Sequence, residues 1–294
     1  MLAQLLRRTI AAQMLFGAAL GYGALGGIWG LLLGGLLSPA LCNGVSVAYS
    51  FARARNPGDG LLWWRALGGE CLANLRFFLL RQPWTWAAPA IQAAMAPQNG
   101  EPGRVPVLLV HGIICNHRVW DLLIPALRAQ GHTVLAINLE PLFTSIDDYA
   151  LPIEQAVQSL CQHTGHAQVA LVGHSMGGVA IRAWMRRYGT QQVAQAITLG
   201  SPHAGTRVRP LVDTVNGQQM AWQSPWLHAL AATESEATRQ LFRIGVSAQD
   251  NIVYPQREQT LQGVQPKLFE GLGHLQLCSA HEVRLWVCQQ LALR

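Results

Sequence analysis

From residue 104 onward, the chain alternates short apolar runs with longer segments of helical periodicity. Apolar runs typical of buried strands lie at 105–110, 133–138, 169–172, 193–199, 242–246 and 267–270. Helices are predicted between and after them at 120–129, 147–161, 176–188 and 279–293. Because such alternation favours crossover connections, residues 104–294 are predicted to form an α/β domain with a doubly wound, mostly parallel sheet.

The N-terminal part has a different pattern. No charged residue lies between Arg8 and Arg53, and Leu, Ala and Gly fill most of the interval. The interval is long enough for two helices of about 20 residues each. We expect residues 1–56 to form a transmembrane hairpin, with helices near 10–25 and 28–51 and a turn at Gly26 and Gly27. One long or tilted helix is the alternative.

Arginines flank both ends of this apolar interval. Arg7 and Arg8 precede it, and Arg53, Arg55 and Arg65 follow it. The positive-inside rule then places both ends of a hairpin, and the rest of the chain, in the cytoplasm. A single signal anchor would instead place the rest of the chain outside. A cleaved signal peptide fits poorly, because its apolar region is usually only about 7 to 15 residues long.

Residues 57–103 read as an amphipathic, aromatic segment followed by a linker. At helical spacing, Leu72, Leu75, Phe78 and Leu79 share one face. Tryptophans lie near both ends of the segment, at Trp63, Trp64, Trp84 and Trp86, as interfacial anchors do. A helix packed on the following domain and a helix lying on a membrane surface both fit this pattern. Prolines and glycines in 89–106 indicate the linker.

The composition narrows the choice of partners. Charged residues make up 12% of the chain, about half the usual share, and the deficit lies in the N-terminal apolar interval. The net charge is +6, but the basic residues are scattered and Lys267 is the sole lysine, so we expect a membrane-facing basic fringe and no nucleic-acid partner. The six cysteines have no zinc-like spacing and are expected to be reduced and mostly buried, although an even number also permits disulfides. We expect no metal or cofactor.

The most informative motif is Gly173-His174-Ser175-Met176-Gly177-Gly178, which directly follows the run 169–172. The glycines let the chain turn sharply from a strand into a helix and expose the Ser175 side chain at the strand's C-terminal end. The Met176 amide, at the start of the helix, would then point toward an oxyanion beside Ser175 Oγ. The motif predicts a nucleophilic serine, although many matches to so short a pattern are ordinary turns.

Other segments supply the partners that such a serine needs. The turn His111-Gly112-Ile113 ends the first strand, and the Ile113 amide is the candidate second oxyanion donor. After Ser175, an acid and then a histidine are required, and Asp250 and His274 follow later strands in that order. The alternatives are Asp213, Glu234 and Glu236 for the acid and His281 for the base.

These segments, with the stretch Gly200-Ser201-Pro202-His203-Ala204-Gly205-Thr206, resemble an α/β-hydrolase of the lipase/esterase group, including bacterial lipases and PGAP1-like acyl-ester hydrolases. The resemblance covers about 104–294. It implies Ser175 as nucleophile, Asp250 as acid and His274 as base, with the Ile113 and Met176 amides as oxyanion hole. It also implies a cap at about 205–243, which is strongly apolar.

The expected substrate pocket draws on the cap and on the site motifs. A lid function would place Met220, Trp222 and Trp226 around an acyl chain, together with His111, Gly112 and His174. Packing of surface helices on the sheet is the alternative for the cap. The N-terminal half resembles membrane-anchored bacterial hydrolases with a hydrophobic hairpin, which implies a location in the bacterial inner membrane.

The expected function is a membrane-anchored serine hydrolase that cleaves lipid-like or other carboxylic esters through an acyl-enzyme. An acyltransferase would use the same three residues with an alcohol in place of water. A non-catalytic binding protein on the same scaffold would usually have lost one of them, and none is missing here.

Overall fold

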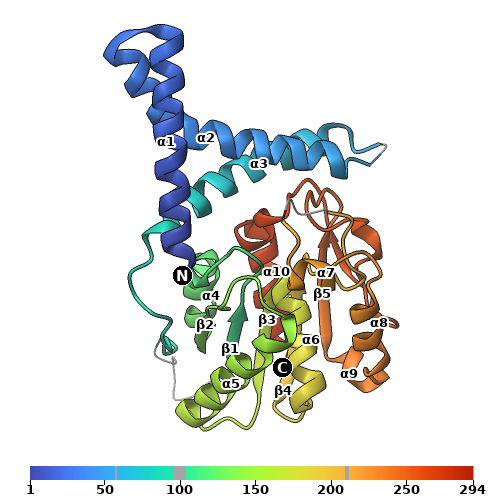
Figure 1. The fold of residues 1–294 in the computed structure, drawn as a ribbon. Coiled ribbons are helices and arrows are strands. Elements are labelled where there is room, and N and C mark those ends of the chain that lie inside the picture. The colour runs from blue at the N-terminus through green and yellow to red at the C-terminus, as the bar shows by residue number, and fades with distance from the viewer. Residues whose placement is uncertain (57, 96–103, 209–211, 294) are drawn as a thin grey trace.

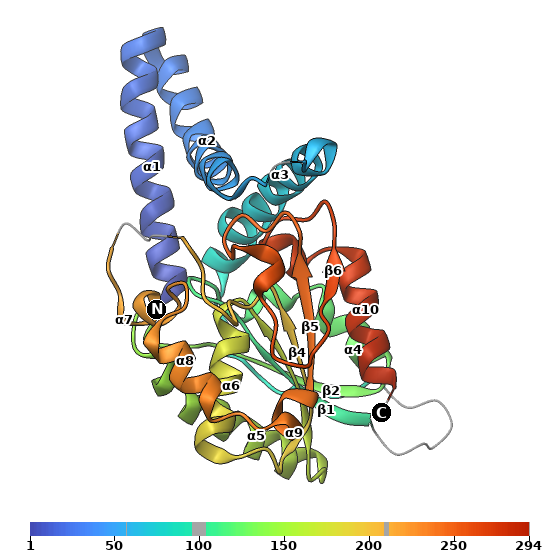
Figure 2. The same cartoon turned by 90° about the vertical axis from the view of Figure 1, so that its right-hand side faces the viewer.

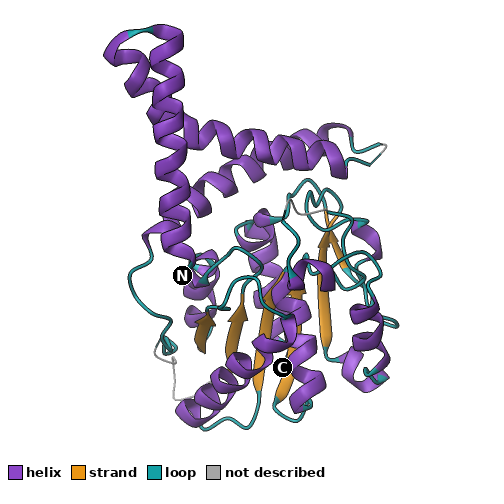
Figure 3. Ribbon diagram, viewed as in Figure 1, coloured by secondary structure: helices purple, strands orange, loops and turns teal. Residues whose placement is uncertain are grey.

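The computed structural model describes residues 1–56, 58–95, 104–208 and 212–293. Within them lies a six-stranded, fully parallel sheet in the order β2-β1-β3-β4-β5-β6 (Figure 3). The strands are β1 (Arg104–Val110), β2 (His132–Ile137), β3 (Val169–His174), β4 (Val193–Leu199), β5 (Phe242–Ser247) and β6 (Lys267–Phe269). The predicted α/β architecture is confirmed.

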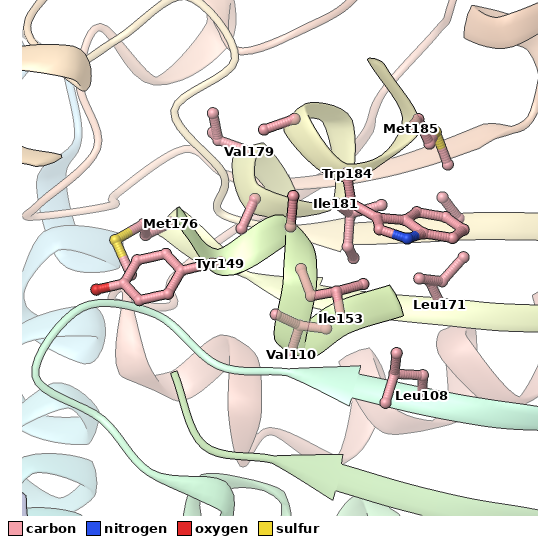
Figure 4. Close-up of a cluster of buried hydrophobic side chains, with 14 of the residues drawn as sticks. Leu108, Val110, Tyr149, Ile153, Leu171, Met176, Val179, Ile181, Trp184 and Met185 are labelled. Carbon is pink, nitrogen blue, oxygen red and sulfur yellow. The ribbon is translucent and has the colours of Figure 1, made fainter. Parts of the chain in front are cut away.

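Helices cover both faces of the sheet, as a doubly wound fold requires (Figures 1 and 2). One face carries α5 (Ala150–Thr164) and α6 (Met176–Tyr188), and the other carries α4 (Leu123–Ala129) and α10 (His281–Ala292). Successive residues of β1 point to opposite faces, so Leu108 and Val110 pack under α5 and α6 while Val107 and Leu109 pack under α4 and α10. Figure 4 shows the first of these two cores.

Two predicted helices begin later than expected. Short 3-10 turns at His117–Trp120 and Ile146–Tyr149 take up the first residues of the predicted helices 120–129 and 147–161. Side chains just before each turn explain the difference. Asn116 accepts a hydrogen bond from the Arg118 amide and Ser145 accepts one from the Asp147 amide, so each turn closes before the helix starts.

The N-terminal hairpin consists of α1 (Leu2–Leu25) and α2 (Gly27–Ala54), which project away from the α/β domain (Figure 1). Glycines allow the two helices to pack very closely, since a Cβ on Gly21 would stand 2.0 Å from the Gly30 carbonyl oxygen. Ser38 Oγ also donates a 2.7 Å hydrogen bond across to the Gln13 carbonyl. Beyond the hairpin tip, α2 turns away from α1 (Figure 2), and Pro39 lies inside this helix.

Of the helices in the described ranges, α2 is the one with the length and apolar composition needed to cross a membrane. Large apolar side chains lie exposed along both helices of the hairpin, among them Phe16, Leu20, Leu25, Trp29 and Leu36. The turn at Gly26 agrees with the predicted hairpin. For α1, which carries Arg7 and Arg8, a membrane span stays a prediction.

The base of the hairpin packs on the rest of the molecule. Leu2 and Leu6 at the start of α1 contact Leu142, and the N-terminal amino group lies 2.8 Å from Glu140 Oε1. At the other end, the last turns of α2 bury Val47 and Phe51 against Ala66 and Trp63 of the next helix. The hairpin is thus fixed to the α/β domain by both of its ends.

Helix α3 (Gly60–Asn74) continues into a π-helical turn, Leu75–Arg81, and a 3-10 turn, Gln82–Trp84. Ala73 and Phe77 belong to the core under α4 and α10, so the segment packs on the α/β domain. The buried face differs from the predicted one, because Leu72 is 68% exposed and Glu70 is buried instead. In this orientation Glu70 packs against the turn that carries His274.

The predicted linker 89–106 is also partly different. Pro106 lies inside β1, and Gln92 forms an isolated antiparallel bridge with Val134 at the edge of the sheet. This pairing extends the edge next to β2. Residues 96–103 of the linker lie outside the described part of the chain.

The described residues of 205–243 form three short helices, α7 (Val215–Gln219), α8 (Pro225–Ala232) and α9 (Glu236–Gln240). Met220, Leu227 and Leu230 are buried in the core under α5 and α6. Packing of surface helices is therefore the arrangement that this segment adopts. All six cysteines are free, and Cys115, Cys278 and Cys288 are buried.

Candidate active site

Ser175 stands on a sharp turn between β3 and α6, as the strand-turn-helix motif predicted. Its backbone has φ 55° and ψ −128°, a conformation that costs energy for any residue with a side chain. The flanking glycines are required by close contacts, since a Cβ on Gly173 would stand 2.6 Å from the Gly178 nitrogen and one on Gly177 would stand 2.2 Å from the Val110 oxygen. The surrounding turn maintains this strained conformation and keeps Ser175 at the C-terminal end of β3.

Asp250 and His274 form a buried pair. Asp250 follows β5 and His274 follows β6, and His274 Nδ1–H donates a 2.8 Å hydrogen bond to Asp250 Oδ2. The other carboxylate oxygen accepts the amides of Ile252 and Val253 at 2.8 and 2.7 Å, which fixes the acid. This arrangement leaves His274 Nε2 as the ring nitrogen available to a reacting group.

The alternative acids and base lie elsewhere. Glu234 pairs with Arg182, Asp213 accepts a hydrogen bond from Gln218, Glu236 begins α9, and His281 begins α10 beside Arg284. The structure therefore brings together the expected acid and base and not their alternatives.

The electrostatics of the pair favour a protonated imidazole. Burial lowers the pKa of His274, but the Asp250 carboxylate, its hydrogen bond and the Glu70 carboxylate raise it, and the balance places the pKa above its ordinary value. An imidazolium formed during a reaction would thus be stabilised where it forms.

Ser175 and His274 share a cavity of about 510 Å³. Its floor is formed by the loop after β1 and by the ends of β3 and β6, whereas its roof is formed by the N-terminal helices, with Leu6 of α1, Val47 of α2 and Phe78 beyond α3. In the described part of the chain, the Ser175 hydroxyl makes no hydrogen bond within 3.5 Å. Such contacts often tighten only when a substrate is bound.

The loop after β1 lies directly against the serine. A Cβ on Gly112 would stand 2.7 Å from the Ser175 Cβ, and Ile113 follows at the cavity wall. Met176 is the first residue of α6, so its amide is one of the free donors of the first turn. Its side chain points away from the cavity into the core beside Tyr149 (Figure 4).

Ile114 was not singled out by the sequence. It has φ 53°, which is rare for a β-branched residue and indicates that the surroundings force this conformation. The residue lines the cavity next to Ile113. Strain thus occurs both in the serine turn and in the loop opposite it.

The two histidines of the motifs form hydrogen bonds with backbone groups. His111 donates from Nδ1 to the Gly112 carbonyl at 2.7 Å and accepts the Leu139 amide at Nε2 at 3.0 Å. Burial lowers the pKa of His111 to about 4, so its ring is neutral and supports the loop without lining the cavity. His174 does line the cavity, and its Nε2–H donates to the His274 carbonyl at 3.1 Å. Burial lowers the pKa of His174 well below its ordinary value.

The cap residues do not reach this cavity. Among the described residues that line it, none belongs to 205–243. Met220 is buried in the core, Trp222 stacks beneath Arg207, and Trp226 donates its indole N–H to Asp147. None of the three lines the cavity, so the expectation that they surround the acyl chain there is corrected.

Three residues near the pair were missed as site residues. Gly200 has φ 56°, and a Cβ there would stand 3.1 Å from Asp250 Oδ2, so the Gly-Ser-Pro-His stretch was the signal for it. Asn251 accepts the His274 amide at 3.0 Å, and its place next to Asp250 was a further signal. Glu70 touches the other side of the His274 turn from α3, and no local motif could have indicated it. In the described ranges, no group of three or more His, Cys, Asp or Glu side chains stands together as a metal site would require.

Residues 105–239 match the family model for the alpha/beta hydrolase fold. The chain has the α/β-hydrolase fold. The mature lipase BlEst2 of Bacillus licheniformis shares this α/β-hydrolase arrangement, with a TM-score of 0.57 and 15% identity over 69% of this chain and 98% of that one.

Two curated relatives of this chain match shorter segments. A triacylglycerol lipase of Burkholderia plantarii is 32% identical over 135 residues, which are 43% of this chain and 37% of the relative. Salicylic acid-binding protein 2 of Nicotiana tabacum is 33% identical over 103 residues, 32% of this chain and 38% of the relative. The chain thus spans less than half the length of these relatives.

Proposed function

We propose that the chain is a membrane-anchored serine hydrolase that cleaves carboxylic esters with an apolar acyl chain. The observation that carries the proposal is that Ser175 and His274 line the floor of one cavity, with His274 hydrogen-bonded behind it to Asp250. The similarity to a triacylglycerol lipase and to the BlEst2 lipase fold supports an ester as substrate.

The proposed reaction proceeds through an acyl-enzyme. Ser175 Oγ attacks the ester carbonyl carbon while its proton passes to His274 Nε2, and Asp250 holds the Nδ1–H so that the correct nitrogen is free. The amides of Ile113 and Met176 stabilise the oxyanion, each contributing about 3 kcal/mol. The imidazolium protonates the leaving alcohol. Water, deprotonated by His274, then releases the carboxylic acid and restores Ser175.

The shape of the cavity supports an apolar acyl chain. A volume of about 510 Å³ lies within the range of about 300 to 1,000 Å³ that is usual for ligand sites. Leucine, isoleucine, valine and phenylalanine side chains supply much of its wall: Leu5, Leu6, Val47, Phe78, Ile113, Ile114, Ile252 and Leu275. In this proposal the N-terminal hairpin, and not the cap 205–243, covers the acyl chain.

The hairpin also supports a membrane location. Its exposed surface is apolar between Arg8 and Arg53, and its glycine contacts resemble those of helices that pack within lipid. Because the same helices roof the cavity, an ester could pass from the bilayer to Ser175 without crossing water. The arginines at both ends favour a cytoplasmic α/β domain.

The function is tested by Ser175→Ala in the full chain, with Ser235→Ala at the exposed N-cap of α9 as the control. We expect loss of fluorophosphonate labelling and a decrease of at least about 1,000-fold in kcat/KM for p-nitrophenyl esters in Ser175→Ala. Ser235→Ala should keep both. Wild-type hydrolysis by folded Ser175→Ala would remove the basis of the proposal.

The orientation is tested separately with a cysteine-reactive, membrane-impermeant label. The variant carries Glu236→Cys on exposed α9 and Cys42→Ser, which removes the exposed native thiol of the hairpin. We expect labelling in inverted inner-membrane vesicles only. Labelling from the periplasmic side of intact spheroplasts would reverse the proposed topology.

A further inference from the structure

Glu70 of α3 lies buried against the turn that carries His274. The residue is 1% exposed and lines the cavity that holds Ser175 and His274. Glu70 Oε1 accepts the Leu275 amide at 2.9 Å, and Oε2 accepts the Gln276 amide at 3.1 Å. Each carboxylate oxygen therefore holds one of the two residues that follow the imidazole.

The packing around this contact is tight. A Cβ on Gly273 would stand 2.5 Å from Glu70 Oε2, so a larger residue at 273 would displace the carboxylate. Gln276 Oε1 accepts the Gly273 amide at 2.7 Å, and a Cβ on Gly69 would stand 2.0 Å from Gln276 Nε2. Two consecutive residues of α3 thus fix the turn 273–276 from one side.

A carboxylate suits this place better than a neutral amide would. Glutamate presents two acceptors to the two amides, whereas glutamine would present one acceptor and one donor. Burial raises the pKa of Glu70 to about 7, although the Leu275 amide, His274 and the Gln276 amide act to lower it. A carboxylate kept at this cost beside a histidine of the cavity indicates more than packing.

The titratable groups that face His274 and Glu70 come from several elements. Asp250 after β5 binds Nδ1 of His274, and the ring of His174 at the end of β3 lies 4.6 Å from the His274 ring. The Glu70 charge acts on three nearby thiols: Cys71 on α3, Cys115 after β1 and Cys278 after His274. Burial raises the pKa of each thiol and lowers that of His174, so these four groups are neutral near neutral pH. The negative charges that act on His274 are then Asp250 and the ionised form of Glu70, which with a pKa of about 7 is partly protonated near neutral pH.

We propose that Glu70 is a positioning residue for His274, so that the N-terminal segment completes the active site. The inference rests on the proposed function, because it takes His274 as the base that accepts the Ser175 proton. The carboxylate holds the turn so that the imidazole stays against Asp250, and its charge stabilises the imidazolium. Residue 70 precedes the span 105–239 that matches the family model for the alpha/beta hydrolase fold.

The test is Glu70→Gln in the full chain in detergent, with Glu154→Gln as matched control. Glu154 on α5 also accepts side-chain hydrogen bonds, from Trp184 and Gln158 at 2.8 Å each, and does not line the cavity. The readouts are thermal unfolding and the pH dependence of kcat/KM for a short, soluble p-nitrophenyl ester. We expect kcat/KM to fall about 10- to 100-fold in Glu70→Gln, the rate equivalent of one lost hydrogen bond to a charged group.

The acid limb of the Glu70→Gln profile should also move to lower pH, because His274 loses a charge that raises its pKa. Glu154→Gln should change neither kcat/KM nor the position of the acid limb, whatever its effect on the unfolding temperature. A folded Glu70→Gln with wild-type kcat/KM and an unmoved acid limb overturns the inference, even where its unfolding temperature is lower. In that case Glu70 serves the fold alone.

If Glu70→Gln does not fold, Gly273→Ala tests the role of Glu70 instead. The added Cβ displaces the Glu70 carboxylate without removing it. Reduced kcat/KM supports the inference, and wild-type kinetics contradict it. Ser175→Ala is measured alongside. Activity retained in Ser175→Ala defeats the proposed function, whereas inactive Ser175→Ala together with wild-type Glu70→Gln defeats only the role of Glu70.

Discussion

Asn251 donates a 2.8 Å hydrogen bond from its side-chain amide to the Ser50 hydroxyl of α2. The amide oxygen of the same side chain accepts the backbone N–H of His274 at 3.0 Å. Gln256 makes a similar link, since its Nε2 donates to the Ala54 carbonyl at 3.0 Å and to the Asp250 carbonyl at 2.9 Å. The end of the hairpin is therefore tied by side chains to both loops of the acid and base pair.

This link predicts that Ser50→Ala lowers activity without touching the reacting groups. Asn251 would lose its acceptor, and an unsatisfied buried donor costs about 1 to 3 kcal/mol, so the loop that holds His274 should become less ordered. We expect kcat/KM for a short ester to fall about 3- to 10-fold in steady-state assays. Ser235→Ala is the control, and equal rates in the two variants would show that the link has no kinetic role.

The positions of Ser175, Asp250 and His274 could be predicted from sequence because each follows a strand. Parallel strands direct their carboxyl ends to one edge, so three separate loops meet there whatever the details of packing. The strain at Ser175 was also implied locally, by the glycines that flank it. Short-range pattern and sheet topology together were sufficient for this part of the site.

The residues that roof the cavity could not be predicted from sequence in the same way. Contacts such as Ser50 with Asn251 join positions that are 201 residues apart, and neither residue has a local pattern that requires the other. The apolar cap was expected to form this roof, yet Leu227 and Leu230 pack on α6 instead. An apolar composition predicts that a segment packs against another part of the molecule, but which part it contacts depends on tertiary packing.

The charge of Asp250 predicts a specific pH response in Asp250→Asn. An asparagine in this place can donate to His274 Nδ1 and hold the ring in the wrong tautomer, so kcat should fall by about 10,000-fold, the effect typical of this substitution in such triads. The wild-type enzyme loses activity as the pH falls through the raised pKa of His274, because the base must be neutral.

Removal of the Asp250 charge lowers that pKa, so the acid limb of the residual activity should move to lower pH. The measurement is kcat/KM against pH across the neutral range, with fluorophosphonate labelling as a second rate. An acid limb that keeps its wild-type position in Asp250→Asn would contradict the assignment of the pair.

The buried ion pair between Arg182 of α6 and Glu234 predicts an effect on stability. Its side chains are 0% and 6% exposed, with contacts of 2.6 and 3.0 Å between the guanidinium and the carboxylate. Glu234→Gln leaves a buried cation without its partner, which should lower the free energy of unfolding by about 3 to 5 kcal/mol. Denaturant unfolding followed by circular dichroism measures this, with exposed Glu236→Gln as the control. Equal stability of the two variants would mean that water or another group compensates Arg182.

The roof of the cavity predicts which substitution changes the preference for acyl length. Val47 of α2 is buried at the cavity wall with 4% exposure, whereas Val45 on the same helix is 70% exposed. Val47→Phe fills part of the space at the cavity wall that a long acyl chain would occupy, so the ratio of kcat/KM for long-chain to short-chain p-nitrophenyl esters should fall about tenfold. Val45→Phe makes the same chemical change toward lipid and should leave the ratio unaltered.

The competing explanation is that the cap 205–243 binds the acyl chain after a movement that the structure does not contain. Under that explanation Val47→Phe leaves the ratio unchanged and Trp226→Ala, which removes a large apolar side chain from α8, alters it. If the hairpin roofs the pocket, the outcomes are reversed, because Trp226 donates its indole N–H to Asp147 and does not line the cavity. Measurement of both variants with one ester series therefore separates a pocket roofed by the membrane hairpin from one roofed by the cap.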